Sequence, residues 1–383
     1  MGLLRHFQST VKAGMSLEER WHAWIRDEKL RRLGWAIYVC DSPSVEDHVI
    51  NPQQGNDSSI CYLYNGRPCL SVTDIDMDLQ SSTEQWEAES PQAWAALHPW
   101  TETGPQNIRF RPSMRGLYDR PEEVLRQLTE GHHQIPFILT LMRMLWTSKE
   151  IEASPLNNHE HCDSKLAKSN MEILDLIDRF LDPAEINAKN ASPVAMYKAQ
   201  TIHMAHLIGA GDIMDWLYSL LRPGPEADVA RARMHRWALE DPPRVRQIAY
   251  HSAQVLAINR RFPHNSPAEP FNVFHAGAVL WCVAQLLSHS SQVSQAVNKS
   301  NQSAICQIDS LKASCDPEMV EVKTWVKNGG IRIVSLSGVP NLCAMEGRRQ
   351  VLEQTAKVFD RMRVWGISQN FLKVIISLIA NEE

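Results

Sequence analysis

Closely spaced cysteine pairs are absent from this sequence. Its eight cysteines are scattered, with no two within four residues of each other: Cys40, Cys61, Cys69, Cys162, Cys282, Cys306, Cys315 and Cys343. A structural zinc finger needs close ligand pairs such as C-x-x-C, because a tight turn must present two thiolates to one tetrahedral ion. The spacing therefore excludes a zinc finger within these 383 residues. No secretory route is predicted, so we expect the thiols to be reduced.

A surplus of basic residues is also missing. The chain has 39 Lys and Arg against 44 Asp and Glu, which gives a formal net charge of −5, and it contains no block of five or more basic residues. Domains that bind nucleic acid through its phosphates usually carry a clear positive excess. We therefore expect no specific binding of duplex DNA by this chain alone.

Long apolar runs are lacking. No stretch approaches the roughly 18–20 apolar residues that a membrane span requires, and even residues 137–146 are interrupted by Arg143. The first residues, MGLLRHFQSTVKAG, contain no long apolar segment before a small-residue cleavage site. A signal peptide is therefore not predicted, and neither is contact with a membrane.

The common catalytic and phosphate-binding motifs do not occur. The sequence has no G-x-S-x-G, no Walker-type glycine loop and no G-x-G-x-x-G following a strand. We predict no catalytic, cofactor-binding or metal-binding residues, no cofactor, and no enzymatic activity.

Histidines keep one alternative open. His203 and His206 lie three residues apart in an apolar helix, but two ligands are too few for a metal site and H-E-x-x-H is absent. A denser group at residues 159–163, HEHCD, includes the ligand-type side chains of His159, His161, Cys162 and Asp163. Neighbouring residues in one loop rarely close a tetrahedron, and His132 and His133 are expected to be a surface or helix-entry pair. The alternative is a helical metal- or cofactor-dependent enzyme that uses these histidines.

A tryptophan-rich helix near the start is the strongest positive feature. Residues 21–41 read W-x-x-W-I-x-x-E-x-x-R-R-x-x-W-x-x-Y-x-x-D, and the apolar positions recur with the period of one helix face. Glu28 and Arg32 lie in the same stripe four residues apart, in the order that suits an ion pair on a helix. They are either a solvated pair beside the core or a half-buried polar latch that fixes how the helix docks.

The rest of the chain also has helical periodicity. Helices are expected at 124–146, broken by Pro136, and at 168–181, 195–221, 244–262, 273–287 and 349–380, the last divided near Gly366. One alternating run, residues 331–336, is interpreted as extended without a sheet to join. The predicted fold is all-α, a multi-helix bundle with long polar loops.

Polar segments interrupt the helical periodicity, but we do not expect them to separate two domains. In residues 288–304, eleven of seventeen positions are Ser, Gln or Asn, so the segment buries too little apolar area to offset its ordering entropy. We predict a mobile loop at 286–318 inside a single domain of residues 1–383.

Four blocks along the chain resemble the fungal-specific transcription factor domain, the helical regulatory region of fungal zinc-finger transcription factors. They are the tryptophan helix, residues 65–71 together with 84–97, residues 237–282 and residues 325–378, and they occur in the order typical of that family. The signature positions in this chain are Trp21, Trp24, Glu28, Arg31, Arg32, Trp35, Asp41, Trp86 and Trp94. Two departures, at 77–80 and at Pro340, indicate a divergent member, and the signature helix beginning already at Trp21 indicates an N-terminally shortened one.

This resemblance implies transcription regulation in a fungal nucleus, of the RNA polymerase II type, with a metabolic or biosynthetic gene set as one candidate target. The partners would be the transcription machinery or other regulators, and DNA would be reached indirectly or through a zinc-finger segment missing from this chain. A homodimer and the sensing of a small-molecule effector remain open. The twelve tryptophans are expected to fill a helix cluster, although an aromatic-rich bundle can also enclose a pocket.

Overall fold

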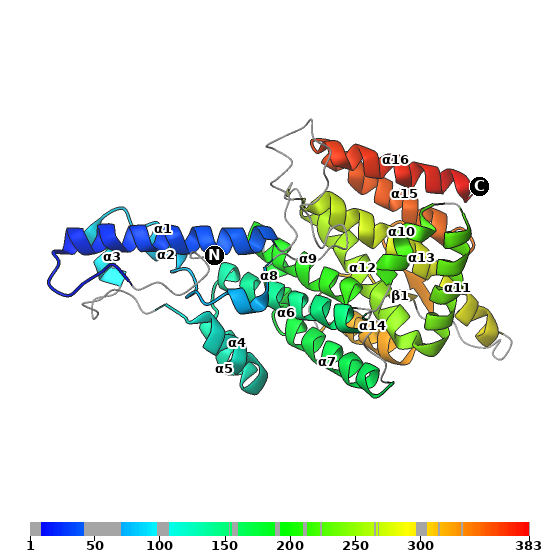
Figure 1. The fold of residues 1–383 in the computed structure, drawn as a ribbon. Helices are drawn as coiled ribbons and strands as arrows, with labels where there is room; N and C mark the ends of the chain where they lie inside the picture. Colours follow the sequence, from blue (N-terminus) through cyan, green and yellow to red (C-terminus); the bar gives the residue numbers. More distant parts are fainter. Residues whose placement is uncertain are drawn as a thin grey trace. The chain divides into compact units, whose positions relative to one another are not determined.

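Helices dominate the computed structural model (Figure 1). It describes residues 9–41, 70–97, 107–152, 154, 160–187, 192–209, 213–222, 224–263, 266, 268–295, 305–312, 315–330 and 332–382, with the backbone alone at 40–41, 160–167 and 288–295. Within those residues the strands are two segments of three residues each. The prediction of an all-α fold is confirmed.

The chain divides into two compact units, Met1–Thr147 and Ser148–Glu383. The sequence predicted one domain over residues 1–383, and whether the two units act as one domain stays a prediction.

The first unit is built on the tryptophan helix. Its elements are α1 (Leu17–Asp41), a 3₁₀ turn (Val72–Asp74), α2 (Thr83–Trp86), α3 (Pro91–Leu97), α4 (Phe110–Asp119), α5 (Pro121–Gln127) and most of α6 (Gly131–Glu152). Helix α1 begins with a capping box, in which the Ser16 N–H donates to Glu19 Oε2 (2.8 Å) and the Glu19 N–H donates to Ser16 Oγ (3.3 Å). Helix α3 packs against α1 (Figure 1).

Pro136 does not break a helix, contrary to the prediction. Helix α6 runs through it, and the break falls earlier, between α5 and α6. An interior proline costs about 3 kcal/mol because it removes one donor and crowds one carbonyl. Phe137, Ile138 and Leu141 on the same helix are completely buried, and each contributes about 1.5–3 kcal/mol. Their burial outweighs the cost of the proline.

The second unit surrounds one apolar helix. Its helices are α7 (Glu160–Asp178), α8 (Pro183–Asn187), α9 (Pro193–Ile208), α10 (Ile213–Leu220), α11 (Pro225–Glu240), α12 (Pro242–Arg261), α13 (Glu269–Gln295), α14 (Pro317–Asn328), α15 (Gly347–Phe359) and α16 (Gly366–Asn381). The expected helix at 195–221 is therefore two helices, because α9 ends at Ile208. The division near Gly366 is confirmed.

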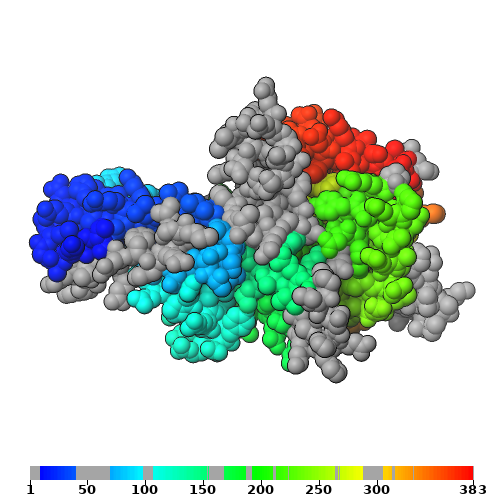
Figure 2. Space-filling model, in the orientation of Figure 1, coloured from blue at the N-terminus to red at the C-terminus, as the bar shows by residue number. Residues whose placement is uncertain are grey.

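Helix α13 forms the centre of this unit and packs against α12 and α15. By length and composition, Glu269–Leu287 could span a membrane, a window that the sequence analysis did not identify, but 94 % of it is buried inside the protein. On the face drawn in Figure 2, little of the yellow α13 reaches the surface. This is how a core helix packs.

A small parallel sheet joins segments that the sequence treated as unpaired. Strand β1 (Ile305–Gln307) pairs with β2 (Ile333–Ser335), with Cys306 opposite Val334. The run at 331–336 therefore has a sheet partner, which corrects the prediction. The partner lies within the predicted loop of 286–318, whose start is also helical to Gln295; residues 296–304 lie outside the described part of the chain.

Candidate functional site

Four signature residues of α1 are buried in the first unit. Trp24 and Trp35 are buried, Glu28 is completely buried, and Arg31 is 7 % exposed. The burial agrees with the apolar helix face that the sequence predicted for residues 21–41. The side chain of Asp41 lies outside the described residues.

Glu28 is the centre of a buried polar cluster. Its Oε1 accepts from Arg32 Nε (2.9 Å) and from the Ser81 N–H (2.9 Å), and its Oε2 accepts from Ser81 Oγ (3.0 Å) and from Arg31 Nη1. The predicted pairing of Glu28 with Arg32 is confirmed, and the interpretation as a solvated pair is wrong. Four donors on one carboxylate satisfy a charge that would otherwise be costly to bury.

Two basic side chains therefore share one acid, and the sequence analysis identified only one of them as its partner. The Asn107 amide lies 3.1 Å from Ser81 Oγ, and when its oxygen faces Arg31 it accepts from Arg31 Nη1 and Nη2 at 3.0 Å. The Arg32 guanidinium also lies 4.4 Å from the centre of the Trp86 ring, a cation–π contact. The cluster is thus enclosed on several sides within the first unit.

The segment at residues 78–83 holds this cluster in place. Trp35 Nε1 donates to the Asp78 carbonyl (2.9 Å), and Arg32 Nη2 donates to the Ser81 carbonyl (3.1 Å). Backbone acceptors thus fix both a tryptophan and an arginine of α1. No local spacing links residue 81 to residue 28, so sequence reasoning missed this segment.

Two further buried groups were missed. Asp27, which is 2 % exposed, accepts from the Thr10 N–H and Thr10 Oγ1 at 2.8 Å. Arg143 donates to the Tyr38 carbonyl (3.1 Å) and the Leu70 carbonyl, and its guanidinium lies 4.1 Å from the Tyr38 ring centre. Arg143 had been noted only as a charge that interrupts an apolar run. In the structure it connects α6 to α1.

The tryptophans of the first unit pack in two places. Trp24 and Trp94 are buried with their ring centres 5.4 Å apart, and Trp21 and Trp86 pack against the same apolar cluster. Trp35 instead contacts Phe110 edge-on, at 5.0 Å between ring centres. The five tryptophans predicted to fill one cluster are therefore divided, although all contribute to packing.

In the second unit, His203 and His206 of α9 meet His251 of α12. A hydrogen bond joins Nδ1 of His203 and Nδ1 of His251 (2.9 Å), and the His206 ring stacks on His251 at 3.6 Å. His206 Nε2 lies 2.7 Å from Asp178 Oδ1. Burial, with His206 adding to it, lowers the pKa of His203 to about 3 and that of His251 well below 6.5. His203 and His251 are neutral near pH 7.

Two of these histidines, His203 and His251, line a cavity of about 260 Å³. Its walls combine apolar and polar side chains from five helices and the segment after β1, including His203, Tyr250, His251, Gln254, Lys312 and Lys323. Lys312, one of the lining residues, also pairs with Glu318 (2.7 Å). A pocket was considered in the sequence analysis for a tryptophan-lined bundle, whereas none of the residues that line this cavity is a tryptophan.

The denser histidine group at 159–163 is not a loop throughout. Helix α7 begins at Glu160, which corrects the sequence prediction, because amphipathic residues 168–178 extend the helix toward the N-terminus. The side chains of His161, Cys162 and Asp163, and all of His159, lie outside the described residues. Their convergence with His203 is therefore untested.

The cysteines described in the second unit are free thiols. Burial raises the pKa of Cys282 to about 12 and that of Cys306 to about 11. Both remain protonated near pH 7 and are poor nucleophiles.

Comparison with known proteins gives one informative match. An 84-residue part of the chain is 30 % identical to Zinc finger protein zas1 of Schizosaccharomyces pombe, covering 22 % of this chain and 8 % of that protein. The alignment thus spans less than a tenth of the relative's length. No family model and no solved structure matches the chain. The match relates part of the chain to a fungal zinc finger protein, while the assignment to the specific regulatory domain stays a prediction.

Proposed function

We propose that this chain is a regulatory region of a fungal transcription regulator and acts in the nucleus. The observation that carries the proposal is the match to a fungal zinc finger protein, and the resemblance of four sequence blocks agrees with it. The chain would act through protein contacts with the transcription machinery or other regulators, or as a homodimer. DNA would be bound by another segment or another protein.

Effector sensing has a candidate site in this proposal. The cavity beside His203 and His251 has a size and a mixed polar and apolar lining suited to a small molecule. A ligand there would contact α9, α12 and α14 together. The ligand would increase the population of the helix arrangement that binds it most tightly. This shift in population would couple ligand binding to regulation.

The experiment is a tethering assay in a fungal host. The full chain is fused to an unrelated DNA-binding domain and directed to a reporter promoter, with the DNA-binding domain alone as control. A change of several-fold in reporter expression, in either direction, supports the proposal. A stable, nuclear fusion that leaves expression equal to that of the control contradicts it.

The alternative of a metal- or cofactor-dependent enzyme has one observation in its favour, the convergence of His203, His206 and His251 beside a cavity. Their ring nitrogens, however, are largely occupied by one another, by Asp178 and by Gln247. Such pairing suits helix packing better than metal binding. Activity of purified protein that is lost on metal removal, with a neutral tethering result, would favour the enzyme.

A further inference from the structure

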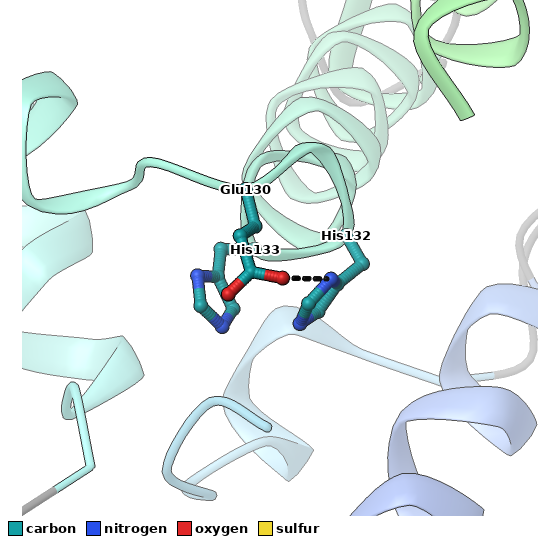
Figure 3. A group of neighbouring side chains, drawn as sticks. All are labelled: Glu130, His132 and His133. Carbon is teal, nitrogen blue, oxygen red and sulfur yellow. Dashed lines mark ion pairs between the residues drawn. The ribbon is translucent and has the colours of Figure 1, made fainter. Parts of the chain in front are cut away.

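Three ligand-type side chains converge at the start of α6 in the first unit. Glu130 directly precedes the helix, and His132 and His133 lie in its first turn. One ligand atom of each lies within 4.8 Å of the other two. Figure 3 shows the Glu130 carboxylate between the two imidazole rings.

The hydrogen bonding of the His133 ring is the kind found in metal-binding histidines. It is 7 % exposed, and its Nε2 lies 2.9 Å from the Gln80 carbonyl oxygen, to which only an Nε2–H can donate. The proton of the neutral ring is therefore on Nε2, so Nδ1 carries a lone pair. Nδ1 is buried and has no hydrogen-bond partner. A histidine that donates one ring N–H to a carbonyl and offers the other nitrogen is typical of metal ligands.

Glu130 is oriented by the same neighbouring segment. Its Oε2 accepts from the Thr83 N–H (3.1 Å) and from Thr83 Oγ1 (2.7 Å), and it lies 3.4 Å from His132 Nδ1. These contacts all fall on Oε2 and fix the carboxylate beside the rings. Nε2 of His132 is also buried without a hydrogen-bond partner, although the Ser81 backbone lies near that ring.

We propose that Glu130, His132 and His133 bind one divalent transition-metal ion, with Zn²⁺ the ion that fits best. Two imidazoles and one carboxylate are ligands that Zn²⁺ accepts, and three protein ligands leave a position for water. The carboxylate offsets part of the ion's charge. It also counters the positive end of α6, which by itself disfavours a cation.

A metal here would connect the two polar clusters of the first unit. Gln80 and Thr83 hold the ligands, while Ser81 between them binds Glu28 and Arg32. The ion would therefore fix the segment at residues 78–83 between α1 and α6. Its role would be structural and independent of the proposed regulatory activity.

The test is zinc titration of the full chain, purified under reducing conditions and stripped with a chelator. Wild type is compared with a variant that combines Glu130→Gln, His132→Gln and His133→Gln. The matched control combines Glu18→Gln and His22→Gln, an exposed Glu–His pair on α1. We expect the first variant to bind one Zn²⁺ fewer than wild type and the control to bind the same number. Equal stoichiometry in all three proteins would overturn the proposal.

A measurement on wild type keeps the test valid if the triple variant does not fold. X-ray absorption of protein loaded with one equivalent of Zn²⁺ should give imidazole and oxygen ligands at about 2.0–2.2 Å without sulfur. A sulfur shell at about 2.3 Å would mean that cysteines bind the ion first, and would overturn the assignment. If the zinc shell is as expected, Glu130→Gln alone should weaken binding several-fold, and unchanged binding would contradict the site.

Discussion

At the scale of single residues, Glu28 carries the clearest stability prediction. Replacing it with alanine leaves Arg31, Arg32 and the Ser81 donors facing a site without an acceptor. Breaking a buried ion pair on one side typically costs about 3–5 kcal/mol. We expect Glu28→Ala to lower the free energy of unfolding in urea by that amount. Glu18→Ala on the exposed face of the same helix should change it by no more than about 0.5 kcal/mol. If Glu28→Ala also lowered the free energy of unfolding by no more than about 0.5 kcal/mol, the burial of this cluster would be contradicted.

The buried histidines of the second unit predict a dependence of stability on pH. The unfolded chain protonates His203 and His251 near pH 6.5, whereas burial and the neighbouring His206 lower the pKa of His203 to about 3 in the folded chain, and that of His251 is lowered in the same direction. Protonation therefore favours the unfolded state. The contribution of the neutral histidines to the free energy of unfolding is fully present above about pH 6.5. It is lost as the pH falls toward 3, by roughly 1.4 kcal/mol per pH unit for each histidine.

Urea unfolding at about pH 7 and about pH 5.5 measures this effect, which should reach about 2 kcal/mol or more for the two histidines. His251→Asn should reduce the difference, because one titrating group is removed. His22→Gln should not, since His22 is largely exposed. Equal stability of wild type at the two pH values would contradict the burial of these rings.

At the scale of helices, α13 and α15 lie close together at Gly277. A Cβ built there would lie 2.5 Å from Cγ2 and Oγ1 of Thr355, whose hydroxyl donates to the Val351 carbonyl at 2.8 Å. Alanine in place of glycine normally stabilises a helix by up to about 1 kcal/mol. Here overpacking should cost about 1–3 kcal/mol, so Gly277→Ala should lower the midpoint of thermal unfolding.

Two variants separate this clash from a general effect of alanine. Gly366→Ala at the start of α16, where nothing lies within 4 Å of the added Cβ, should be neutral or stabilising. Thr355→Ala should restore part of the stability of Gly277→Ala, because it removes the two nearest atoms, Cγ2 and Oγ1, and leaves only the Thr355 Cβ at 3.0 Å. If Gly277→Ala behaves like Gly366→Ala, the close approach of α13 and α15 is wrong.

At the scale of the whole molecule, the net charge predicts how strongly the chain binds duplex DNA. A net charge of −5 opposes binding to phosphates, and the sequence lacks the cysteine spacing of a zinc finger. We expect selection from a random pool of duplex oligonucleotides, at about 0.15 M salt, to enrich no motif. Residual binding should be weak and should fall steeply with added salt. Enrichment of one motif with submicromolar affinity would contradict this prediction.

The sequence by itself determined the local structure of this protein. Helix α1 and the pairing of Glu28 with Arg32 were predictable, because a helix places residues four apart side by side whatever surrounds it. The all-α class followed from the same periodicity in segment after segment. The lack of closely spaced cysteine pairs is likewise a property of the sequence alone.

The tertiary structure determined which residues far apart in the sequence contact one another. Ser81 reaches Glu28, and His251 joins His203, because packing brings together segments that no periodicity relates. The same holds for the pairing of β1 with β2, because the sequence indicated the extended run at 331–336 but not its partner at 305–307. The continuity of α6 through Pro136 also depended on packing, since the burial of neighbouring side chains, not the local preference of proline, determined it.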